Sequence, residues 1–141
     1  MQKYIGTKII EAEPCKAWKD TKLHKAGEDG YKVRYPDGYE SWSPKDVFEE
    51  AYRPTDCMSF GLAIEAMKKG KKVARRGWNG KNQHIELATR ISYMTDEGVF
   101  VNVEHEAIGN KAIAFCGTSG VQMGWLASQA DMLADDWEVV E

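Results

Sequence analysis

Residues 58–76 have the sequence MSFGLAIEAMKKGKKVARR, which predicts a helix followed at once by a β-strand. Ser59 is a favourable helix N-cap, and Gly70 is the residue type that most often follows the end of a helix. Between them, apolar side chains recur at the spacing of one helical face, at Phe60, Ala63, Ile64 and Met67. A strand is expected next, at 71–76.

The rest of the C-terminal part alternates turn signals with short apolar segments that favour strands. Strands are expected at 83–89, 99–104 and 112–116, with a shorter candidate at 123–126 and a terminal edge strand at 137–140. A second short helix is expected to start near Ser128. Two short helices that punctuate a mostly antiparallel sheet place the segment 57–141 in the α+β class.

Residues 1–55 predict a separate, small β-rich unit with one helix. Strands are expected at 8–12, ending at Pro14, and at 31–35 and 39–42, with a turn at Pro36-Asp37-Gly38. Ser43 and Pro44 then carry helix-start signals, which are a capping hydroxyl and a proline at the first helical position. Pro54 ends that helix, and Pro54-Thr55-Asp56 is the expected joint to the next unit.

Composition limits the possible functions. The 141 residues carry a net charge of −3, which argues against a general nucleic-acid or membrane binder, although seven cations and no acid occur within 68–81. Cys15, Cys57 and Cys116 form no CxxC pair, and no histidine lies at metal-ligand spacing from a cysteine. Neither a disulfide framework, a zinc site nor a cofactor is therefore expected. No signal peptide or membrane-spanning run is visible, so a soluble, intracellular protein is expected.

A first candidate for ligand binding is the strand end and glycine-flanked loop at 75–82, RRGWNGKN. The guanidinium of Arg75 or Arg76 can donate paired hydrogen bonds to phosphate oxygens. Side chains alternate along a strand, so only one of the two arginines is expected to face a ligand. Trp78 offers a flat face for a purine, and Asn79 can meet the polar edge of a base or ribose. Spacing alone favours a plainer interpretation, a tight hairpin turn with a packed tryptophan and solvated cations.

A second candidate surrounds the expected start of the C-terminal helix. Trp125 can stack on a base, whereas Trp137 is assigned to the core. Ser128 and Asp131 fit the [ST]-x-x-[DE] capping box, which is a structural role. A helix N-terminus also favours anions and hydroxyls, so the amides of Ser128 and Gln129 are candidates to face a ligand.

No catalytic constellation is recognisable. The segment Gly117-Thr118-Ser119-Gly120 lacks the second glycine of a G-x-S-x-G nucleophile motif, because Val121 stands at that position. The histidines, His24, His84 and His105, lie in unrelated segments without a visible acid–base partner. An enzyme is therefore not expected.

Three motifs together resemble a family of small phage proteins, the second type of Thoeris anti-defence protein. They are Met58-Ser59-Phe60-Gly61-x-Ala63, Gly70-Lys71-x-Val73-Ala74-Arg75-x-Gly77-Trp78-Asn79-Gly80-Lys81 and Trp125-x-x-Ser128-Gln129-x-Asp131-x-Leu133-Ala134-x-Asp136-Trp137. This resemblance covers about 58–141. The segments 4–8 and 35–44 resemble an N-terminal extension that accompanies the core in many phage relatives.

The resemblance implies a sponge, a homo-oligomer (typically a tetramer) that holds a small cyclic nucleotide between its subunits without cleaving it. The ligand would be a cyclic ADP-ribose isomer made by bacterial TIR-domain enzymes, such as glyco-cyclic ADP-ribose. Its capture in the cytoplasm of the infected host bacterium would block Thoeris signalling. On this basis Trp78 and Trp125 are expected to stack on bases and Phe60 to form an apolar wall. Phosphates would meet Arg75 or Arg76, while base and ribose edges would meet Asn79, Ser128, Gln129 and Asp131.

Three alternatives stay open. Aromatic faces with arginines would also suit cyclic dinucleotides, and the aromatic and basic residues of the N-terminal segment motivate this alternative. An enzyme that degrades the cyclic signal is a second. A small nucleic-acid-binding phage accessory protein is a third, which the acidic net charge disfavours.

Overall fold

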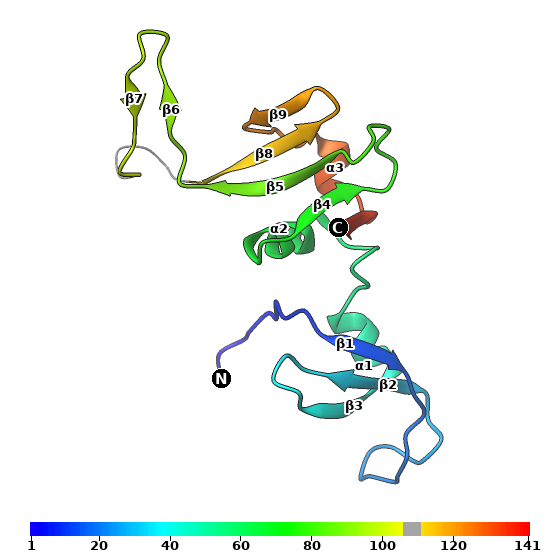
Figure 1. Cartoon of the computed structure of the whole chain (residues 1–141). Coiled ribbons are helices and arrows are strands. Elements are labelled where there is room, and N and C mark those ends of the chain that lie inside the picture. The colour runs from blue at the N-terminus through cyan, green and yellow to red at the C-terminus, as the bar shows by residue number, and fades with distance from the viewer. Residues whose placement is uncertain (106–110) are drawn as a thin grey trace. The chain divides into compact units, whose positions relative to one another are not determined.

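A computed structural model of the protein describes residues 1–105 and 111–141 (Figure 1). Within them the chain divides into two compact units, Met1–Arg53 and Pro54–Glu141, here called the N-terminal unit and the core module. Both combine antiparallel strands with helices, so the predicted α+β class is confirmed. Among the described residues, no helix has the length and apolar character needed to cross a bilayer.

The N-terminal unit is a three-stranded antiparallel sheet with one helix. Its strands β1 (Glu11–Pro14), β2 (Gly30–Arg34) and β3 (Glu40–Pro44) pair in that order, and α1 (Lys45–Ala51) follows β3 directly. Val33 on the central strand is buried. The rings of Tyr31 and Phe48 stack with 4.1 Å between their centroids, which packs α1 against β2.

Two predicted boundaries in this unit are wrong. Ser43 does not cap α1, because it pairs with Tyr31 in the β2–β3 ladder, and Pro44 is the N-cap residue without a side-chain cap bond. The first strand ends at Pro14 as predicted, but it starts at Glu11 rather than at Lys8. Proline has no backbone N–H and cannot donate a hydrogen bond to a neighbouring strand. Pro14 can nevertheless belong to β1, because β1 is an edge strand, in which some backbone N–H groups have no partner strand.

The core module is built on a five-stranded antiparallel sheet with the order β10-β4-β5-β8-β9. Its elements are α2 (Phe60–Lys68), β4 (Lys72–Arg75), β5 (His84–Thr89), β8 (Lys111–Gly117), β9 (Gly120–Met123), α3 (Gln129–Leu133) and β10 (Trp137–Val140). The predicted strands at 71–76, 83–89, 112–116 and 137–140 are confirmed within a few residues. β10 lies at an edge of the sheet, as expected.

The other two predicted strands differ from the structure. Only Phe100–Val101 (β7) of the segment 99–104 is a strand, and it pairs with β6 (Tyr93–Met94) in a two-stranded sheet of its own. The candidate at 123–126 is replaced by β9, which starts earlier because two residues suffice to turn the chain between Gly117 and Gly120. Gly120 has a φ of +122°, a conformation that favours glycine.

The helix α2 lies on the part of the five-stranded sheet that is formed by β10, β4 and β5 (Figure 1). Both of its predicted end signals are confirmed: the Ser59 hydroxyl accepts a hydrogen bond from the Leu62 amide at 3.3 Å, and Gly70 follows the helix at a φ of +86°. The core cluster under α2 contains Met58, Ala63, Ala66, Met67, Val73, Ile85 and Trp137. The sheet side that carries Val73, Ile85 and Trp137 is called the core face below.

Candidate ligand-binding site

Trp137 is the centre of an aromatic cluster in the core module. Its side chain is fully buried, and its indole N–H donates a hydrogen bond to the Asp131 carbonyl at 2.8 Å. Three further rings pack on it with centroid separations of 5.3 to 6.1 Å, namely Phe60, Trp78 and Trp125. The assignment of Trp137 to the core is therefore confirmed, and Phe60, Trp78 and Trp125 lie together although they are distant in sequence.

The two tryptophans predicted to bind the ligand touch each other. Trp78 and Trp125 meet edge to face, with ring centroids 6.0 Å apart and planes inclined at 68°. Trp78 also packs against Phe115 at 5.8 Å. Both indoles are half-buried, so each anchors one part of its ring in the core and leaves another part exposed. Trp78 is thus packed, as the interpretation of 75–82 as a tight hairpin turn predicts. The parts of the Trp78 and Trp125 rings that stay accessible to solvent still form an aromatic surface.

The loop that carries Trp78 is a tight turn after β4. The Trp78 amide donates to the Arg75 carbonyl at 3.1 Å, and the Gln83 amide donates to the Gly80 carbonyl at 3.1 Å. A Cβ atom at Gly80 would approach Gln83 Oε1 to 2.0 Å, so a larger residue at this position would require the Gln83 side chain to move. Asn79 is exposed on the same loop.

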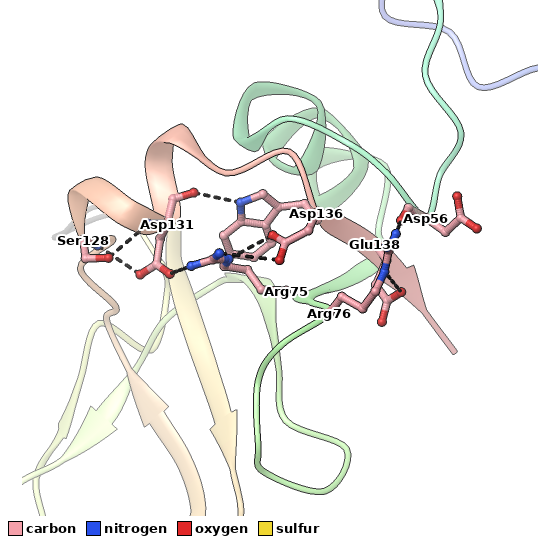
Figure 2. A network of polar contacts seen from close by, with 8 residues as sticks. Asp56, Arg75, Arg76, Ser128, Asp131, Asp136 and Glu138 are labelled. Atoms are coloured by element: carbon pink, nitrogen blue, oxygen red, sulfur yellow. Dashed lines mark hydrogen bonds and ion pairs between the residues drawn. The ribbon is translucent and has the colours of Figure 1, made fainter.

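Arg75 is held by two carboxylates (Figure 2). Its Nη1 lies 3.1 Å from Asp131 Oδ1, and its Nε lies 3.0 Å from Asp136 Oδ1. These contacts bridge 56 and 61 residues of sequence and tie β4 to α3, through Asp131, and to Asp136, the residue before β10. One positive and two negative charges leave a local surplus of negative charge, which disfavours a diphosphate. The structure therefore gives Arg75 a positioning role that the sequence did not reveal.

Arg76 points away from this network (Figure 2). It donates to the Asp56 carbonyl and lies 4.0 Å from a Glu138 carboxylate oxygen. Its side chain is 57% exposed, against 25% for Arg75. The two arginines thus face opposite sides, as alternation predicts, and Arg76 is the more accessible cation.

The start of α3 is closed by a complete capping box. The Ser128 hydroxyl accepts from the Asp131 amide, and the Asp131 carboxylate accepts from the Ser128 amide, both at 3.1 Å. These groups therefore satisfy each other, which is the structural role that the motif predicts. Gln129, the first residue of α3, is exposed.

Asp131 couples this cap to Arg75 and makes the stability of the core module depend on pH. Burial on its own would raise the pKa of Asp131, but hydrogen bonds from Ser128 and Arg75 outweigh it and lower that pKa below its ordinary value. A lowered pKa in the folded state means that the contribution to stability is complete above about pH 4, the ordinary pKa of aspartate, and is lost as the pH falls further.

We expect Asp131→Asn to destabilise the core module at pH 7 and to flatten the decline in its stability below about pH 4, because the substituted side chain no longer titrates. Urea unfolding at a series of pH values measures this. Asp135→Asn is the matched control, since Asp135 is an exposed aspartate in the same segment. An unchanged acid limb in Asp131→Asn would contradict the role assigned to this carboxylate.

Sequence reasoning missed several polar groups that the fold brings together. Asp136 binds Arg75, and the indole N–H of Trp137 donates to the carbonyl of Asp131. The only signal for either in the sequence was the position of these two residues at the start of a predicted edge strand. His84, Glu86 and Cys116 form a group of potential metal ligands among the described residues. Their spacing along the chain gave no signal, because β5 and β8 become neighbours only through sheet pairing.

Two open hollows lie in the N-terminal unit. One, of about 160 Å³, is lined by residues of β1, β2 and β3, and the other, of about 430 Å³, lies beside Lys16, Tyr31 and Glu49. None of the predicted ligand residues lines either hollow. The candidate site of the core module is accordingly a half-exposed aromatic surface rather than either of these hollows.

Comparison with known proteins identifies the core module. The sequence model of a family described as the Thoeris anti-defense 2-like domain matches residues 58–140. The chain belongs to this family. A curated relative, "Thoeris anti-defense 2" of Bacillus phage SP01, is 38% identical over 86 residues, which cover 59% of this chain and 94% of the relative. All residues predicted to contact a ligand lie within the matched segment, and the family supports a function directed against Thoeris defence.

Proposed function

We propose that this Thoeris anti-defense 2-like protein is a non-catalytic sponge in the cytoplasm of the infected host bacterium. It binds a TIR-derived cyclic ADP-ribose isomer, such as glyco-cyclic ADP-ribose, and keeps it from the Thoeris receptor. Family membership supports the anti-Thoeris part of this proposal. The observation that carries the binding part is the pair of half-exposed indoles of Trp78 and Trp125, anchored edge to face on a buried tryptophan.

Fixed aromatic rings suit this ligand for a physical reason. A purine presents a flat apolar face, and stacking it on an indole contributes about 1–3 kcal/mol per base. The indoles of Trp78 and Trp125 are already held by contacts with Trp137, so little side-chain entropy is lost when a base stacks on them. Phe60, 6.3 Å from Trp125 between ring centroids, supplies the apolar wall of the proposed site.

The proposal assigns the phosphate contact to Arg76 and not to Arg75. Arg75 is committed to Asp131 and Asp136, whereas Arg76 is exposed. Asn79 and Gln129 remain as exposed polar groups for base and ribose edges. Arg75 lies on the core face with Trp137, and Arg76 points the opposite way, so a pocket that uses both the indoles and Arg76 needs a second copy of the chain.

Self-assembly, with a tetramer as the proposed state, also agrees with the exposed surface of the core module. Five large apolar side chains that are 40% to 95% exposed occur within 121–133, at Val121, Met123, Leu126, Met132 and Leu133. Such a concentration of exposed apolar surface is typical of protein interfaces. A pocket enclosed between copies would supply the burial needed for nanomolar affinity, about −12 kcal/mol.

The deciding experiment incubates the purified protein with TIR-derived cyclic ADP-ribose, filters it, and then heats the protein-bound fraction. We expect the signal to disappear from the filtrate and to return chemically intact after heating, as chromatography would show. A linear product would instead identify a degrading enzyme. Signal that stays in the filtrate would remove the sponge, and parallel arms with cyclic dinucleotides and with RNA over a range of salt concentrations test the two other ligand classes.

A further inference from the structure

His84, Glu86 and Cys116 meet on one face of the five-stranded sheet. His84 lies directly opposite Cys116 in the β5–β8 ladder, and Glu86 lies two residues further along β5. Because cross-strand partners share a face and side chains alternate along a strand, all three point to the same side. Ile85, between the two β5 residues, is fully buried on the core face, so the three polar side chains lie on the opposite face.

The atoms that can bind a metal are close together. One nitrogen, oxygen or sulfur atom from each of the three side chains lies within 4.8 Å of the others, and each residue is half-buried. The Cys116 thiol donates to Glu86 Oε1 at 3.4 Å. The His84 ring bonds through Nδ1 to the Asn82 carbonyl at 2.7 Å. A carbonyl oxygen can only accept, so this bond places the proton on Nδ1 and leaves a lone pair on Nε2.

A thiolate, an imidazole and a carboxylate are the three ligand types of zinc sites. A tetrahedral Zn²⁺ has bonds of about 2.0–2.3 Å, so its ligand atoms lie roughly 3.3–3.7 Å apart. The Cys116–Glu86 separation of 3.4 Å already lies in this range. Because all three atoms lie within 4.8 Å of one another, the His84 nitrogen needs a shift of at most about 1 Å, which rotation of a side chain can provide. The bond from the His84 ring to a backbone carbonyl is the outer contact that metal-bound histidines usually make.

We propose that His84, Glu86 and Cys116 form a Zn²⁺ site that links β5 to β8 and leaves the fourth coordination position to solvent. Burial and the neighbouring Glu86 carboxylate raise the pKa of the Cys116 thiol, and Lys72 opposes this only in part, so binding of the ion must release the thiol proton. The site shares no residue with the proposed nucleotide-binding surface, so this proposal can be tested independently of the proposed sponge function.

Metal binding by the full chain, without any nucleotide, tests this proposal. Equilibrium dialysis of the reduced protein against Zn²⁺ should give about one ion per chain. Co²⁺ should produce a thiolate-to-metal charge-transfer absorption band. We expect Cys116→Ser to abolish that band and to lower the Zn²⁺ affinity by at least about tenfold, with His84→Gln and Glu86→Gln lowering the affinity in the same way.

Matched controls come from the same chain. Cys57→Ser removes an exposed thiol that lies outside the proposed site. His24→Gln removes a histidine that pairs with Glu28 and is not part of the proposed site. Both should leave Zn²⁺ binding unchanged. Should Cys116→Ser fail to fold, alkylation of the wild-type chain decides, because Zn²⁺ should protect Cys116 while Cys57 still reacts. Absence of Zn²⁺ binding, a Co²⁺ spectrum without a thiolate band, or equal alkylation of Cys116 with and without Zn²⁺ would each overturn the site.

Discussion

Replacing Trp137 by alanine is expected to lower the free energy of unfolding of the core module by about 3–5 kcal/mol. The side chain is fully buried, and the rings of Phe60, Trp78 and Trp125 all pack against it. The substitution leaves a large cavity and removes the hydrogen bond to the Asp131 carbonyl. Urea unfolding followed by far-UV circular dichroism measures the loss, because this signal does not depend on tryptophan fluorescence.

Two further variants separate the causes of this effect. Trp137→Phe keeps most of the apolar volume and removes the N–H donor, so we expect an intermediate loss of about 1–3 kcal/mol. Trp18→Ala removes an indole of the N-terminal unit that is 57% exposed, and it should change stability by less than about 0.5 kcal/mol. A loss in Trp137→Ala no larger than that in Trp18→Ala would show that Trp137 does not organise the core.

Features with a local physical cause could be predicted from the sequence. The start of α2 depends on the Ser59 hydroxyl and its end on the positive φ of Gly70, and both causes act within a few residues. The capping box of Ser128 and Asp131 is local in the same way. Alternation along β4 was also enough to predict that Arg75 and Arg76 point to opposite sides.

Features that depend on distant partners could not be predicted in this way. Ser43 has the chemistry of a helix cap, but pairing with Tyr31 extends β3 through Pro44. Arg75 has the chemistry of a phosphate ligand, but two carboxylates more than 50 residues away bind it. The residue type determines which interactions a side chain can make, and the tertiary structure determines which of the possible partners lies within reach.

The Arg75 network gives the candidate site its rigidity. It joins β4, which leads into the Trp78 loop, to α3, which follows Trp125. The carbonyl of Asp131 holds the Trp137 indole, and its carboxylate holds both Arg75 and the Ser128 amide. Asp131 therefore connects the helix cap, the ion pair and the aromatic centre. Its bond to Arg75 joins β4, which precedes Trp78, to α3, which follows Trp125, and so supports the two half-buried indoles.

Removing these two indoles should have the largest effect on nucleotide capture. Stacking of the single adenine on this aromatic surface contributes about 1–3 kcal/mol, so Trp78→Ala with Trp125→Ala should weaken binding by at least that amount, roughly 5-fold to 150-fold. Calorimetric titration with TIR-derived cyclic ADP-ribose measures this change. Trp78→Phe with Trp125→Phe should bind with intermediate affinity, because a smaller aromatic face remains.

The interpretation requires that the variants stay folded, since both indoles also pack on Trp137. Thermal unfolding of each variant and its oligomeric state in solution test this directly, and the phenylalanine pair keeps an aromatic ring in both positions against the core. Trp18→Ala serves again as the matched control and should bind like the wild-type protein. If the folded alanine pair captured the cyclic nucleotide as tightly as the wild type, the aromatic surface of the core module would not be the binding site, because the loss of both indoles removes the surface on which the adenine is proposed to stack.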